Sequence, residues 1–357
     1  MTDNINKIRK LIDKIDLDIL RLLTTRGMLA QEMVEAKSNS SNKKIFRPER
    51  EAQILRKIIG SNKGPLKNDH LYTIYREIIS ACLSLETDIK VTCLGPEGSF
   101  SNAALSKFFG SSVTTVFNNS ISDVFSEVQT KKVSYGVVPI ENSYQGSINL
   151  TLEHLMNKET IICGEINLPI NHCLLSKSKK LKDIKKVYSH EQSFLQCREW
   201  LLRNLPDAEK INTSSNSAAA KKISNLKNCA AIAGKDCSTQ YKIPLLKKNI
   251  HDMTGNMTRF IVIGNEPIRS SGLDKTSILI SIDNKSGALN SLLQPLAKNR
   301  ISMSKIESIP TKINNWEYMF LLDIDGHIDD INISNCLKII KKKSLFFKLL
   351  GSYPKSI

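Results

Sequence analysis

The sequence predicts a multidomain chain in which an all-α unit, an α/β unit and a small α+β unit follow one another. In residues 1–90 proline and glycine are scarce, which is typical of long helices. In residues 91–268 short β-branched runs alternate with helical stretches, which is the pattern of an α/β unit. Residues 274–357 show the order strand, helix, strand, strand, helix, strand of a ferredoxin-like module. A length of 357 residues is sufficient for about two or three domains.

The charge balance favours an anionic partner. Lys and Arg number 51 against 35 Asp and Glu, which gives a formal net charge of +16. Such an excess attracts nucleic acid, anionic membranes or small anionic metabolites. A surface biased toward lysine without a functional reason is the alternative explanation for most of the excess. Aromatic residues make up only 6%, so platforms for stacking bases are scarce and we expect no nucleic-acid partner.

The apolar and sulfur-containing residues indicate a cytoplasmic chain without a membrane partner. No run of about 18 apolar residues occurs, so we expect no helix that spans a membrane. The polar beginning MTDNINKIRK lacks the apolar core of a signal peptide, so we expect no export. The eight cysteines form no CxxC pair and the six histidines form no HxxxH pair. We therefore expect reduced thiols and no metal site.

The first predicted helix carries a continuous apolar seam. Apolar residues, interrupted by one arginine, alternate three and four apart at positions 5, 8, 12, 15, 19, 22, 26, 29, 33 and 36. About 32 residues at ~1.5 Å each form a rod of about 50 Å. Because residues 1–90 alone cannot bury such a rod, we expect a homodimer or a higher homo-oligomer.

Charged residues in and beside this seam predict an anion-binding pocket. Arg26 lies in the seam itself, where a buried guanidinium is costly unless an anion meets it. A structural ion pair, or a side chain that reaches out to solvent, would also account for Arg26. Lys37 lies about three turns further along the same side, and Arg9 could join these cations from an antiparallel partner. The next helix is predicted to begin at Pro48. The second and third helices add charged side chains: Arg50, Glu51 and Glu86.

The spacing of these residues resembles that of the all-helical chorismate mutases, which are domain-swapped dimers. The resemblance implies that Arg26 and the partner's Arg9 bind the two carboxylates of chorismate. It also implies that Lys37 and Glu86 hydrogen-bond the ether oxygen, and that Glu51 hydrogen-bonds the ring hydroxyl. The reaction is a pericyclic rearrangement to prephenate that needs no cofactor. Catalysis would come from holding the reactive conformer and stabilising charge at the ether oxygen.

Three positions of the helical unit depart from that family's pattern. Arg47 replaces the usual Asp and Cys82 replaces a small polar Ser, and both are expected to line the site. Arg47 would act at least partly through its main chain. Glu86 occupies a position where bacterial members often carry Gln. Because an ether oxygen only accepts hydrogen bonds, Glu86 has to be protonated to donate one, and we expect mutase activity to fall as pH rises.

Polar residues at the ends of predicted strands suggest a second site in the α/β unit. The motif VPIENSYQG places Glu141 and Asn142 after a buried strand, where the sites of α/β proteins gather. The loop LGPEGSFS precedes a helix and offers free amides to an anion. Each motif alone could also be a helix cap or a structural loop.

Seven motifs in one order closely resemble the prephenate dehydratases across residues 91–268: LGPEGSFS, VPIENSYQG, INHCLL, SHEQSFLQC, TSSNSAAA, AAIAG and NMTRF. The resemblance implies two α/β lobes, like those of periplasmic binding proteins, that close over the substrate. Thr258 is then the residue most closely tied to catalysis, with Phe260 nearby. Arg259 either binds a carboxylate or is structural. The other residues expected to line the cleft are Glu141, Asn142, Ser189, Gln192 and Gln196.

The chemistry of prephenate dehydration fits these residue types. Prephenate loses CO2 and its ring hydroxyl together, driven by formation of an aromatic ring. The enzyme has to orient a carboxylate and assist the departing hydroxide. A hydrogen-bond donor such as Thr258 can do this without a metal or a cofactor.

The C-terminal unit resembles the ACT domains, which bind phenylalanine between subunits and inhibit enzymes of this kind. The residues that carry this resemblance are Gly287, Ala288, Leu289, Glu307 and Ser308. Two positions depart from the pattern, since Asn290 replaces a Val and Ile309 replaces an Arg. Loss of the Arg removes a long polar side chain from the ligand-binding region. We therefore expect weakened or absent phenylalanine feedback.

Taken in order, the three units resemble the bifunctional chorismate mutase/prephenate dehydratases of phenylalanine biosynthesis. Two alternatives remain open at this point. One is a dehydratase whose helical unit serves only for dimerisation. The other is a bilobal regulator that binds a metabolite without turnover, against which the presence of Thr258 and of the Glu141-Asn142 pair argues.

Overall fold

The computed structural model describes residues 2–38, 46–283, 285–310 and 318–357, and they divide into two compact units. The first unit holds Met1–Ile89 and Phe109–Thr114. The second unit holds Lys90–Phe108 and Thr115–Ile357. Among the described helices, none is long and apolar enough to cross a membrane.

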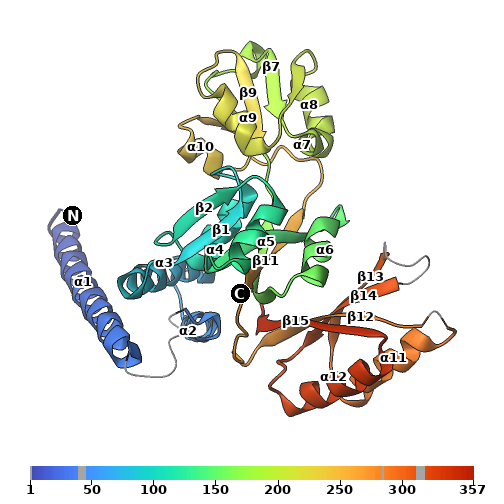
Figure 1. The fold of residues 1–357 in the computed structure, drawn as a ribbon. Helices are drawn as coiled ribbons and strands as arrows, with labels where there is room; N and C mark the ends of the chain where they lie inside the picture. The colour runs from blue at the N-terminus through green and yellow to red at the C-terminus, as the bar shows by residue number, and fades with distance from the viewer. Residues whose placement is uncertain (1, 39–45, 284, 311–317) are drawn as a thin grey trace. The chain divides into compact units, whose positions relative to one another are not determined.

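The first unit contains three helices, as the sequence predicts (Figure 1). Their bounds are α1 (Thr2–Ser38), α2 (Pro48–Gly60) and α3 (Asn68–Glu86). Pro48 opens α2, which confirms its predicted place in a first turn. At that position the N–H that proline lacks would have no partner within the helix.

A small core joins α2, α3 and the segment 109–114. Leu55 of α2 is fully buried, and Ile79 of α3 is nearly so. Gly110 adopts φ +76 beside α3, and a Cβ there would lie 2.4 Å from the Cβ of Ser80. Only glycine fits at such a close approach, so this segment is held directly against α3.

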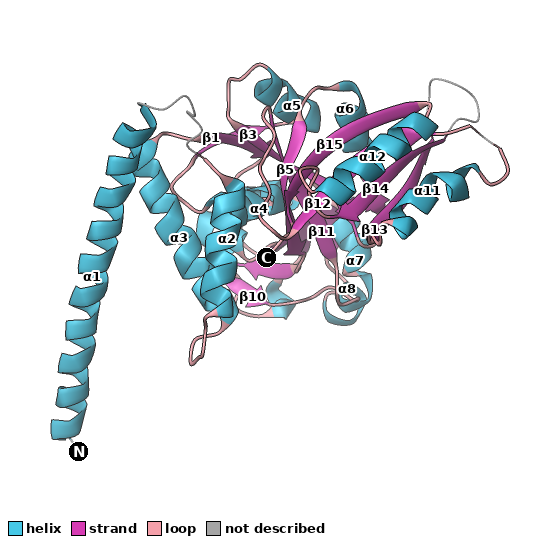
Figure 2. Cartoon of the chain, turned by 90° about the horizontal axis from the view of Figure 1, so that it is seen from below, coloured by secondary structure: helices cyan, strands magenta, loops and turns pink. Residues whose placement is uncertain are grey.

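Helix α1 leaves most of its apolar seam uncovered by the described residues of its unit. Its C-terminal half packs on α3, where a Cβ on Gly27 would lie 3.4 Å from Leu85. Toward the N-terminus, Ile8, Ile12 and Ile15 are each at least 50% exposed. Figure 2 shows this end of α1 extending beyond α2 and α3. A continuous row of exposed isoleucines is the mark of an interaction surface.

The second unit contains three sheets, each with its own helices (Figure 1). Lobe 1 is the sheet β2-β1-β3-β11-β5, with β4 beside β3. Lobe 2 is the sheet β10-β6-β9-β7-β8, and the C-terminal module is the sheet β13-β14-β12-β15. The bounds in lobe 1 are β1 (Lys90–Leu94), α4 (Phe100–Phe109), β2 (Thr114–Asn118), α5 (Ile121–Gln129), β3 (Tyr135–Asn142), β4 (Gly146–Ser147), α6 (Asn149–Asn157), β5 (Ile161–Pro169) and β11 (Met257–Gly264). The bounds in lobe 2 are β6 (Cys173–Ser176), a 3-10 turn (Leu181–Asp183), β7 (Lys186–Ser189), α7 (Glu191–Gln196), α8 (Arg198–Asn204), β8 (Glu209–Asn212), α9 (Asn216–Ile223), β9 (Cys229–Ala233), α10 (Asp236–Gln240) and β10 (Leu245–Lys247).

Two chain segments connect the lobes, and together they are called the hinge. Residues 170–172 lead from β5 to β6, and residues 248–256 lead from β10 back to β11. The main-chain N–H of Ile170 donates to the carbonyl of Asn256 over 2.8 Å, which joins the two segments. Because both segments cross at one place, residues from lobe 1, lobe 2 and the hinge itself meet there.

The C-terminal module has the strand and helix order that the sequence predicts. Its bounds are β12 (Asp274–Ser281), α11 (Ala288–Lys298), β13 (Met303–Pro310), β14 (Tyr318–Asp325), α12 (Ile331–Lys343) and β15 (Phe346–Pro354). All its strand pairs are antiparallel. Ile278, Leu322 and Ile333 lie in the core between this sheet and its helices.

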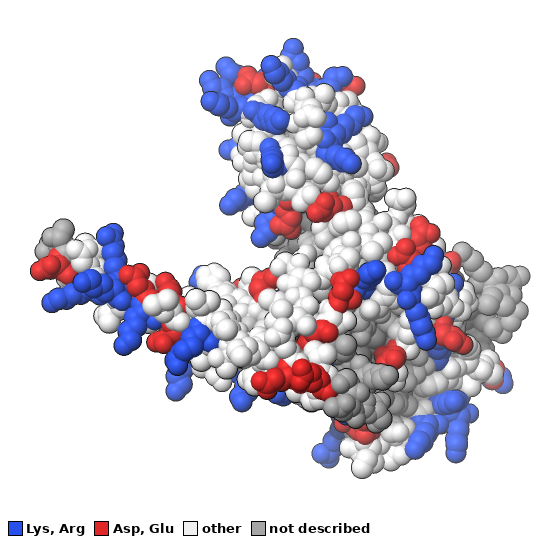
Figure 3. Space-filling model, turned by 60° about the vertical axis from the view of Figure 1, so that its left-hand side comes forward, with Lys and Arg blue, Asp and Glu red and all other residues white. Residues whose placement is uncertain are grey.

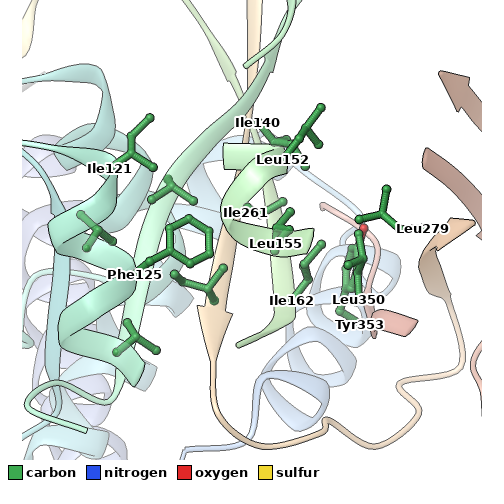
Figure 4. Close-up of a cluster of buried hydrophobic side chains, with 14 of the residues drawn as sticks. Ile121, Phe125, Ile140, Leu152, Leu155, Ile162, Ile261, Leu279, Leu350 and Tyr353 are labelled. Atoms are coloured by element: carbon green, nitrogen blue, oxygen red, sulfur yellow. The ribbon is translucent and has the colours of Figure 1, made fainter. Parts of the chain in front are cut away.

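Lobe 1 and the C-terminal module share one buried core (Figure 4). Tyr353 of β15 and Leu279 of β12 belong to the same cluster as Phe125 of α5. Strand β15 approaches β5 so closely that a Cβ on Gly351 would lie 2.2 Å from the carbonyl oxygen of Ile162. The module is therefore packed onto lobe 1 rather than tethered to it by a linker.

Candidate active sites

A buried ion pair lies at the centre of the first unit. Nη1 of Arg76 in α3 lies 2.5 Å from Oε2 of Glu51 in α2, and both side chains are buried. Arg26 approaches from α1, and its Nη1 donates to the carbonyl of Ile78 over 3.4 Å. Burial raises the pKa of the Glu51 carboxyl, and the charges of Arg76 and Arg26 act against that rise. The three helices thus bring two guanidinium groups toward one carboxyl.

The other residues predicted for this site lie at different depths. Cys82 is buried in α3, Glu86 is half-buried at the end of α3, and Arg47 is half-buried just before α2. Two predicted cations are exposed, namely Arg9 and Arg50. Lys37 lies in the last turn of α1, but its side chain is outside the described residues. The structure therefore brings Arg26 and Glu51 together and leaves Arg9 on the uncovered part of α1.

Sequence reasoning missed Arg76. A signal was present, because Arg76, Ile79 and Leu83 follow one another at the three-four spacing of a buried helix face. Arg26 interrupts the apolar seam of α1 in the same way. Two cations that interrupt apolar faces indicate an anion between the helices, and Glu51 already supplies one such charge to Arg76.

In the second unit, Thr258 and Asn142 form a hydrogen-bonded pair at the hinge end of lobe 1. Strand β11 pairs antiparallel with β3 so that Thr258 lies opposite Asn142, which puts the two side chains on one face. Nδ2 of Asn142 donates to Oγ1 of Thr258 over 2.8 Å. Because the Thr258 oxygen accepts this bond, its own hydrogen is left to donate to another group.

The pair continues into the hinge and lobe 2. Nδ2 of Asn142 also donates to Oδ1 of Asn256 over 2.9 Å, and Nδ2 of Asn256 donates to Oε1 of Gln196 over 3.0 Å. Nε2 of His172 lies 2.7 Å from the same Gln196 oxygen. The structure thus places Gln196 beside Asn142 and Thr258, as predicted for one site. Asn256 and His172 lie inside the motifs NMTRF and INHCLL but were not selected from the sequence.

Arg259 is turned away from Thr258. Its Nη1 lies 2.6 Å from Asp323, its Nε donates to Glu165 over 2.9 Å, and its Nη2 donates to the Tyr353 hydroxyl over 2.9 Å. Burial by itself lowers the pKa of Arg259, but Tyr353, Asp323 and Glu165 raise it above its ordinary value. Successive side chains of a strand point to opposite faces, so Arg259 faces away from Thr258. Of the two predicted roles for Arg259, its contacts with Asp323, Glu165 and Tyr353 support the structural one.

Glu141 contacts the C-terminal module, although the sequence predicts that it lines a cleft together with Asn142. It precedes Asn142 in β3, and its Oε2 lies 2.7 Å from Nζ of Lys305 in the C-terminal module. The Nη1 atom of Arg259 lies 3.9 Å from the same oxygen. The alternation of a strand thus gives Asn142 to the Thr258 side and Glu141 to the module side.

Three further residues predicted for the cleft have mainly structural contacts. Phe260 is 2% exposed and lies in the core, so it supports β11. The hydroxyl of Ser189 is buried and donates to Oδ1 of Asn216 over 3.0 Å, which orders the start of α9. The main-chain N–H of Gln192 donates to Nδ1 of His190 over 3.3 Å in the first turn of α7, and its side chain is half-buried.

The loop that precedes α4 is held by side chains from lobe 2. The hydroxyls of Ser217 and Tyr241 both donate to the carbonyl of Glu97, the latter over 2.7 Å. The thiol of Cys237 lies 3.1 Å from the carbonyl of Gly98, which adopts φ +77. The predicted anion loop is therefore also a contact between the two lobes.

The residues predicted for regulation lie at the start of α11 and near the end of β13 in the C-terminal module. Gly287 adopts φ +79 as the N-cap of α11, a left-handed conformation that favours glycine, and Ala288 and Leu289 follow it half-buried. Glu307 accepts a hydrogen bond from Ser147 of lobe 1. Ser308 is exposed. The module thus touches lobe 1 through the very motif that the sequence singles out.

Part of the positive charge is concentrated on lobe 2. Lys and Arg outnumber Asp and Glu there, and Figure 3 shows basic side chains gathered at the end of this lobe. A basic surface of this kind attracts anionic metabolites by long-range electrostatics.

Comparison with known proteins agrees with this fold and with the order of its units. The family model for prephenate dehydratase matches residues 91–268, and the model for chorismate mutase type II matches residues 8–87. The prephenate dehydratase of Arthrobacter aurescens, solved in complex with L-Phe, superposes with a TM-score of 0.68 at 29% identity, over 74% of this chain and 90% of that one. The prephenate dehydratase of Staphylococcus aureus superposes at 0.66 and 28% identity, over 74% of this chain and all of that one (100%). The second unit is therefore that of a prephenate dehydratase.

Full-length relatives identify the family. The bifunctional chorismate mutase/prephenate dehydratase of Stutzerimonas stutzeri is 42% identical over 360 residues, which cover 99% of both chains. That of Aquifex aeolicus is 42% identical with the same coverage, and that of Escherichia coli is 31% identical over 97% of this chain and 95% of its own. The chain belongs to the family of bifunctional chorismate mutase/prephenate dehydratases.

This membership defines two activities. The chain is an isomerase that converts chorismate to prephenate, and a lyase that converts prephenate to phenylpyruvate, CO2 and water in phenylalanine biosynthesis. A non-catalytic metabolite sensor does not fit these matches. The chorismate mutase match covers nearly the whole helical unit, which agrees with a chain that carries both activities.

Proposed function

We propose that the two activities use two separate sites, the mutase site at Arg26 and Glu51 and the dehydratase site at Thr258 and Asn142. The observation that carries this proposal is that each pair lies within its own compact unit. Chorismate would be bound by guanidinium groups in the first unit. Prephenate would be bound at the hinge in the second unit.

The proposed mutase site works by fixed charge. Arg26 would hold one carboxylate of chorismate, while the buried Glu51–Arg76 pair would orient the ring hydroxyl. Glu86, half-buried at the end of α3, would donate to the ether oxygen as its bond to carbon breaks. Because the cations are already in place, little reorganisation is needed as charge develops on that oxygen.

This mutase site requires a second subunit. Arg9 is exposed on the uncovered half of α1, far along the helix from Arg26, so within one chain the two cannot bind one small substrate. An antiparallel partner helix packed on the exposed isoleucines would bring its own Arg9 to Arg26. We infer a homodimer in which the α1 helix of each subunit supplies its Arg9 to the mutase site of the other subunit.

At the dehydratase site, Thr258 would protonate the departing hydroxyl group. The bond from the ring to the carboxylate breaks, its electron pair completes the aromatic ring, and the hydroxyl leaves as water with the proton. Asn142 donates to Oγ1 of Thr258, so the Thr258 hydrogen points elsewhere and the O–H is polarised for donation. Solvent would then return the proton to Thr258.

Substitutions in the two sites test whether they are separate. Thr258→Val keeps the shape of the side chain but removes the hydroxyl, and we expect the dehydratase kcat to fall roughly 100-fold or more while the mutase is unchanged. Arg26→Met should lower mutase activity by a similar factor, roughly 100-fold, while the dehydratase is unchanged. Both rates are measured on one preparation, so each activity is the control for the other. Equal loss of both activities in either variant would contradict the proposal.

We further propose that the C-terminal module is an ACT domain with weakened phenylalanine binding. Its βαββαβ order, the glycine turn at Gly287 and the contact of Glu307 with lobe 1 support a regulatory role. The relative from Arthrobacter aurescens was solved with L-Phe, whereas Ile309 here replaces the expected polar side chain. Millimolar phenylalanine should inhibit the dehydratase little, and Ile309→Arg should increase the inhibition. Strong inhibition of the unmodified chain would end this proposal.

We also propose that the chain works in the cytoplasm. All eight cysteines are buried free thiols, which suits a reducing compartment. Labelling of the denatured protein with a thiol reagent, immediately after lysis, should give eight modified cysteines.

A further inference from the structure

The side-chain amides of Asn142, Asn256 and Gln196 form a series of hydrogen bonds at the hinge, and the orientation of the first amide determines that of the others. Oδ1 of Asn142 accepts from the main-chain N–H of Tyr144 over 3.0 Å, and a main-chain N–H can only donate. The other end of this amide is therefore the N–H2 group, which faces Oδ1 of Asn256. Consequently the N–H2 group of Asn256 faces Oε1 of Gln196. No amide in this series can be turned over without losing a bond.

The last member of the series is His172, in the first hinge segment. Because Oε1 of Gln196 can only accept, Nε2 of His172 has to carry the proton of the bond between them. The ring is 2% exposed, and its Nδ1 has no hydrogen-bond partner among the described residues. Burial lowers the pKa of His172, His251 acts in the same direction, and the bond to Gln196 opposes them. The ring is therefore neutral near pH 7, with its proton on Nε2.

This arrangement determines which end of Gln196 faces a ligand. Asn256 and His172 both donate to Oε1, so the two N–H groups of Gln196 point away from the hinge. Within the described part of the chain, no residue accepts from them, although the side chain is half-buried on the last turn of α7. The N–H2 group of Gln196, which is joined to Asn142 through Asn256, offers two N–H donors that suit an anionic acceptor such as a carboxylate.

We propose that His172 is a positioning residue of the dehydratase, which holds the Gln196 amide so that its N–H groups face a carboxylate of prephenate. The proposal rests on the substrate contact inferred for Gln196. Without the Nε2–H donor, Gln196 keeps one bond in place of two and is able to turn its carbonyl oxygen toward the substrate. Two oxygens of like partial charge then repel each other, and binding weakens.

The experiment is a double-mutant cycle between His172→Phe and Gln196→Ala, read as kcat and KM for prephenate. Phe keeps the ring and removes the donor, so KM should rise roughly tenfold with kcat little changed, because a carboxylate contact is made in both ground and transition states. In the Gln196→Ala background His172→Phe should add nothing. His172→Gln, which retains an N–H donor, should restore KM. Mutase activity of the same preparation measures the amount of intact chain.

A matched control separates positioning from loss of any buried imidazole. His327 is 1% exposed, and its Nε2 donates to the carbonyl of Ile268 over 3.0 Å, outside both sites. His327→Phe should leave KM for prephenate unchanged. An equal rise of KM in His327→Phe would overturn the proposal, as would an equal effect of His172→Phe with and without Gln196.

Two further outcomes are distinguishable. If Gln196→Ala itself leaves KM unchanged, the substrate contact of Gln196 is wrong, and the positioning role of His172 is overturned with it. If Gln196→Ala raises KM but His172→Phe does not, only the positioning role is wrong. Should His172→Phe fail to fold, Asn256→Asp tests the same claim. The carboxylate introduced by this change would present an oxygen to Oε1 of Gln196. Asn256→Asp should therefore raise KM for prephenate when Gln196 is present and should not raise it further in the Gln196→Ala background.

Discussion

Arg259 and Thr258 are neighbours in β11, yet they serve different parts of the molecule. Thr258 bonds to Asn142 at the hinge, whereas the guanidinium of Arg259 is shared between Asp323 of the module and Glu165 of lobe 1. A buried guanidinium is tolerated only when such partners meet it. Arg259 therefore fixes the strand that carries Thr258, and it does so through the C-terminal module.

Asp323→Asn tests this role of Arg259. Replacing a buried carboxylate that bonds to Arg259 over 2.6 Å should lower the free energy of unfolding of the second unit by about 2 kcal/mol. Asp325→Asn is the matched control, because Asp325 pairs with Lys355 at a partly exposed position and should contribute less than ~1 kcal/mol. Chemical denaturation of both variants measures the difference. Equal effects of the two substitutions would show that the Arg259 contact adds little.

The buried ring of His172 predicts a pH dependence of stability. Its pKa in the folded chain is lowered by burial, whereas the unfolded chain has the ordinary value of about 6.5. The unfolded state therefore binds more protons below that pH, so this contribution is complete above pH ~6.5 and is lost as the pH falls toward the folded pKa. Unfolding of the second unit should therefore become easier as the pH falls below ~6.5. His172→Gln should make this dependence weaker, and an unchanged slope would contradict the prediction.

At the scale of elements, α1 differs from every other described helix in how much apolar surface it leaves uncovered. The alternating spacing that makes it helical also collects its isoleucines on one side, and each turn adds another. Helix α3 covers the part of α1 near Gly27, whereas the isoleucines toward the N-terminus are exposed. The proposed dimer interface, rather than the core of its own unit, would account for the length of α1.

Ile12→Lys tests that interface. In a monomer the change would be nearly neutral, since Ile12 is 50% exposed. In the proposed dimer it buries an unpaired charge, so the helical units should separate and mutase activity should fall with them. Sedimentation and mutase assays on the same samples measure both effects. Lys14→Glu, on the opposite side of α1, should change neither; retention of the mutase by Ile12→Lys would argue against an exchanged helix.

At the scale of the whole molecule, the C-terminal module is energetically part of the dehydratase unit. Leu279, Leu350 and Tyr353 lie in the core of lobe 1, and Lys305 and Glu307 bond to its polar surface. A module joined in this way is coupled directly to β3 and β11, because its side chains bind Glu141 and Arg259. Any ligand that shifts the module would therefore act on the strands that carry Asn142 and Thr258.

Gly351→Ala tests this shared core. The new Cβ would lie 2.2 Å from the carbonyl oxygen of Ile162, so β15 and β5 would have to separate. We expect the thermal transition of the dehydratase unit to fall by several degrees, with loss of dehydratase activity at the same temperature. Gly272→Ala is the control, because Gly272 also has a positive φ (+92) but no atom within 4 Å of its Cβ position. A module that melts alone in Gly351→Ala would contradict the shared core.

Local sequence patterns were sufficient to predict the order of the helices and strands and some of the residues of the candidate sites. Helical periodicity predicted α1 to α3, β-branched runs predicted most strands, and the proline at position 48 predicted where α2 begins. The residues Thr258, Asn142 and Gln196 could be named because they lie in local motifs, and the structure brings these three together. These features depend on neighbours in the chain, so they can be recognised without knowing the rest of the fold.

Only the tertiary structure decided which face each side chain occupies and which way each amide points. Adjacent residues of β3 and β11 alternate between the hinge side and the module side, so the register of the two strands separates Glu141 and Arg259 from Asn142 and Thr258. Arg76 and His172 gain their roles from Glu51 and Gln196, which lie 25 and 24 residues away along the chain. Such pairings depend on how distant segments pack, and for that reason a local pattern cannot specify them.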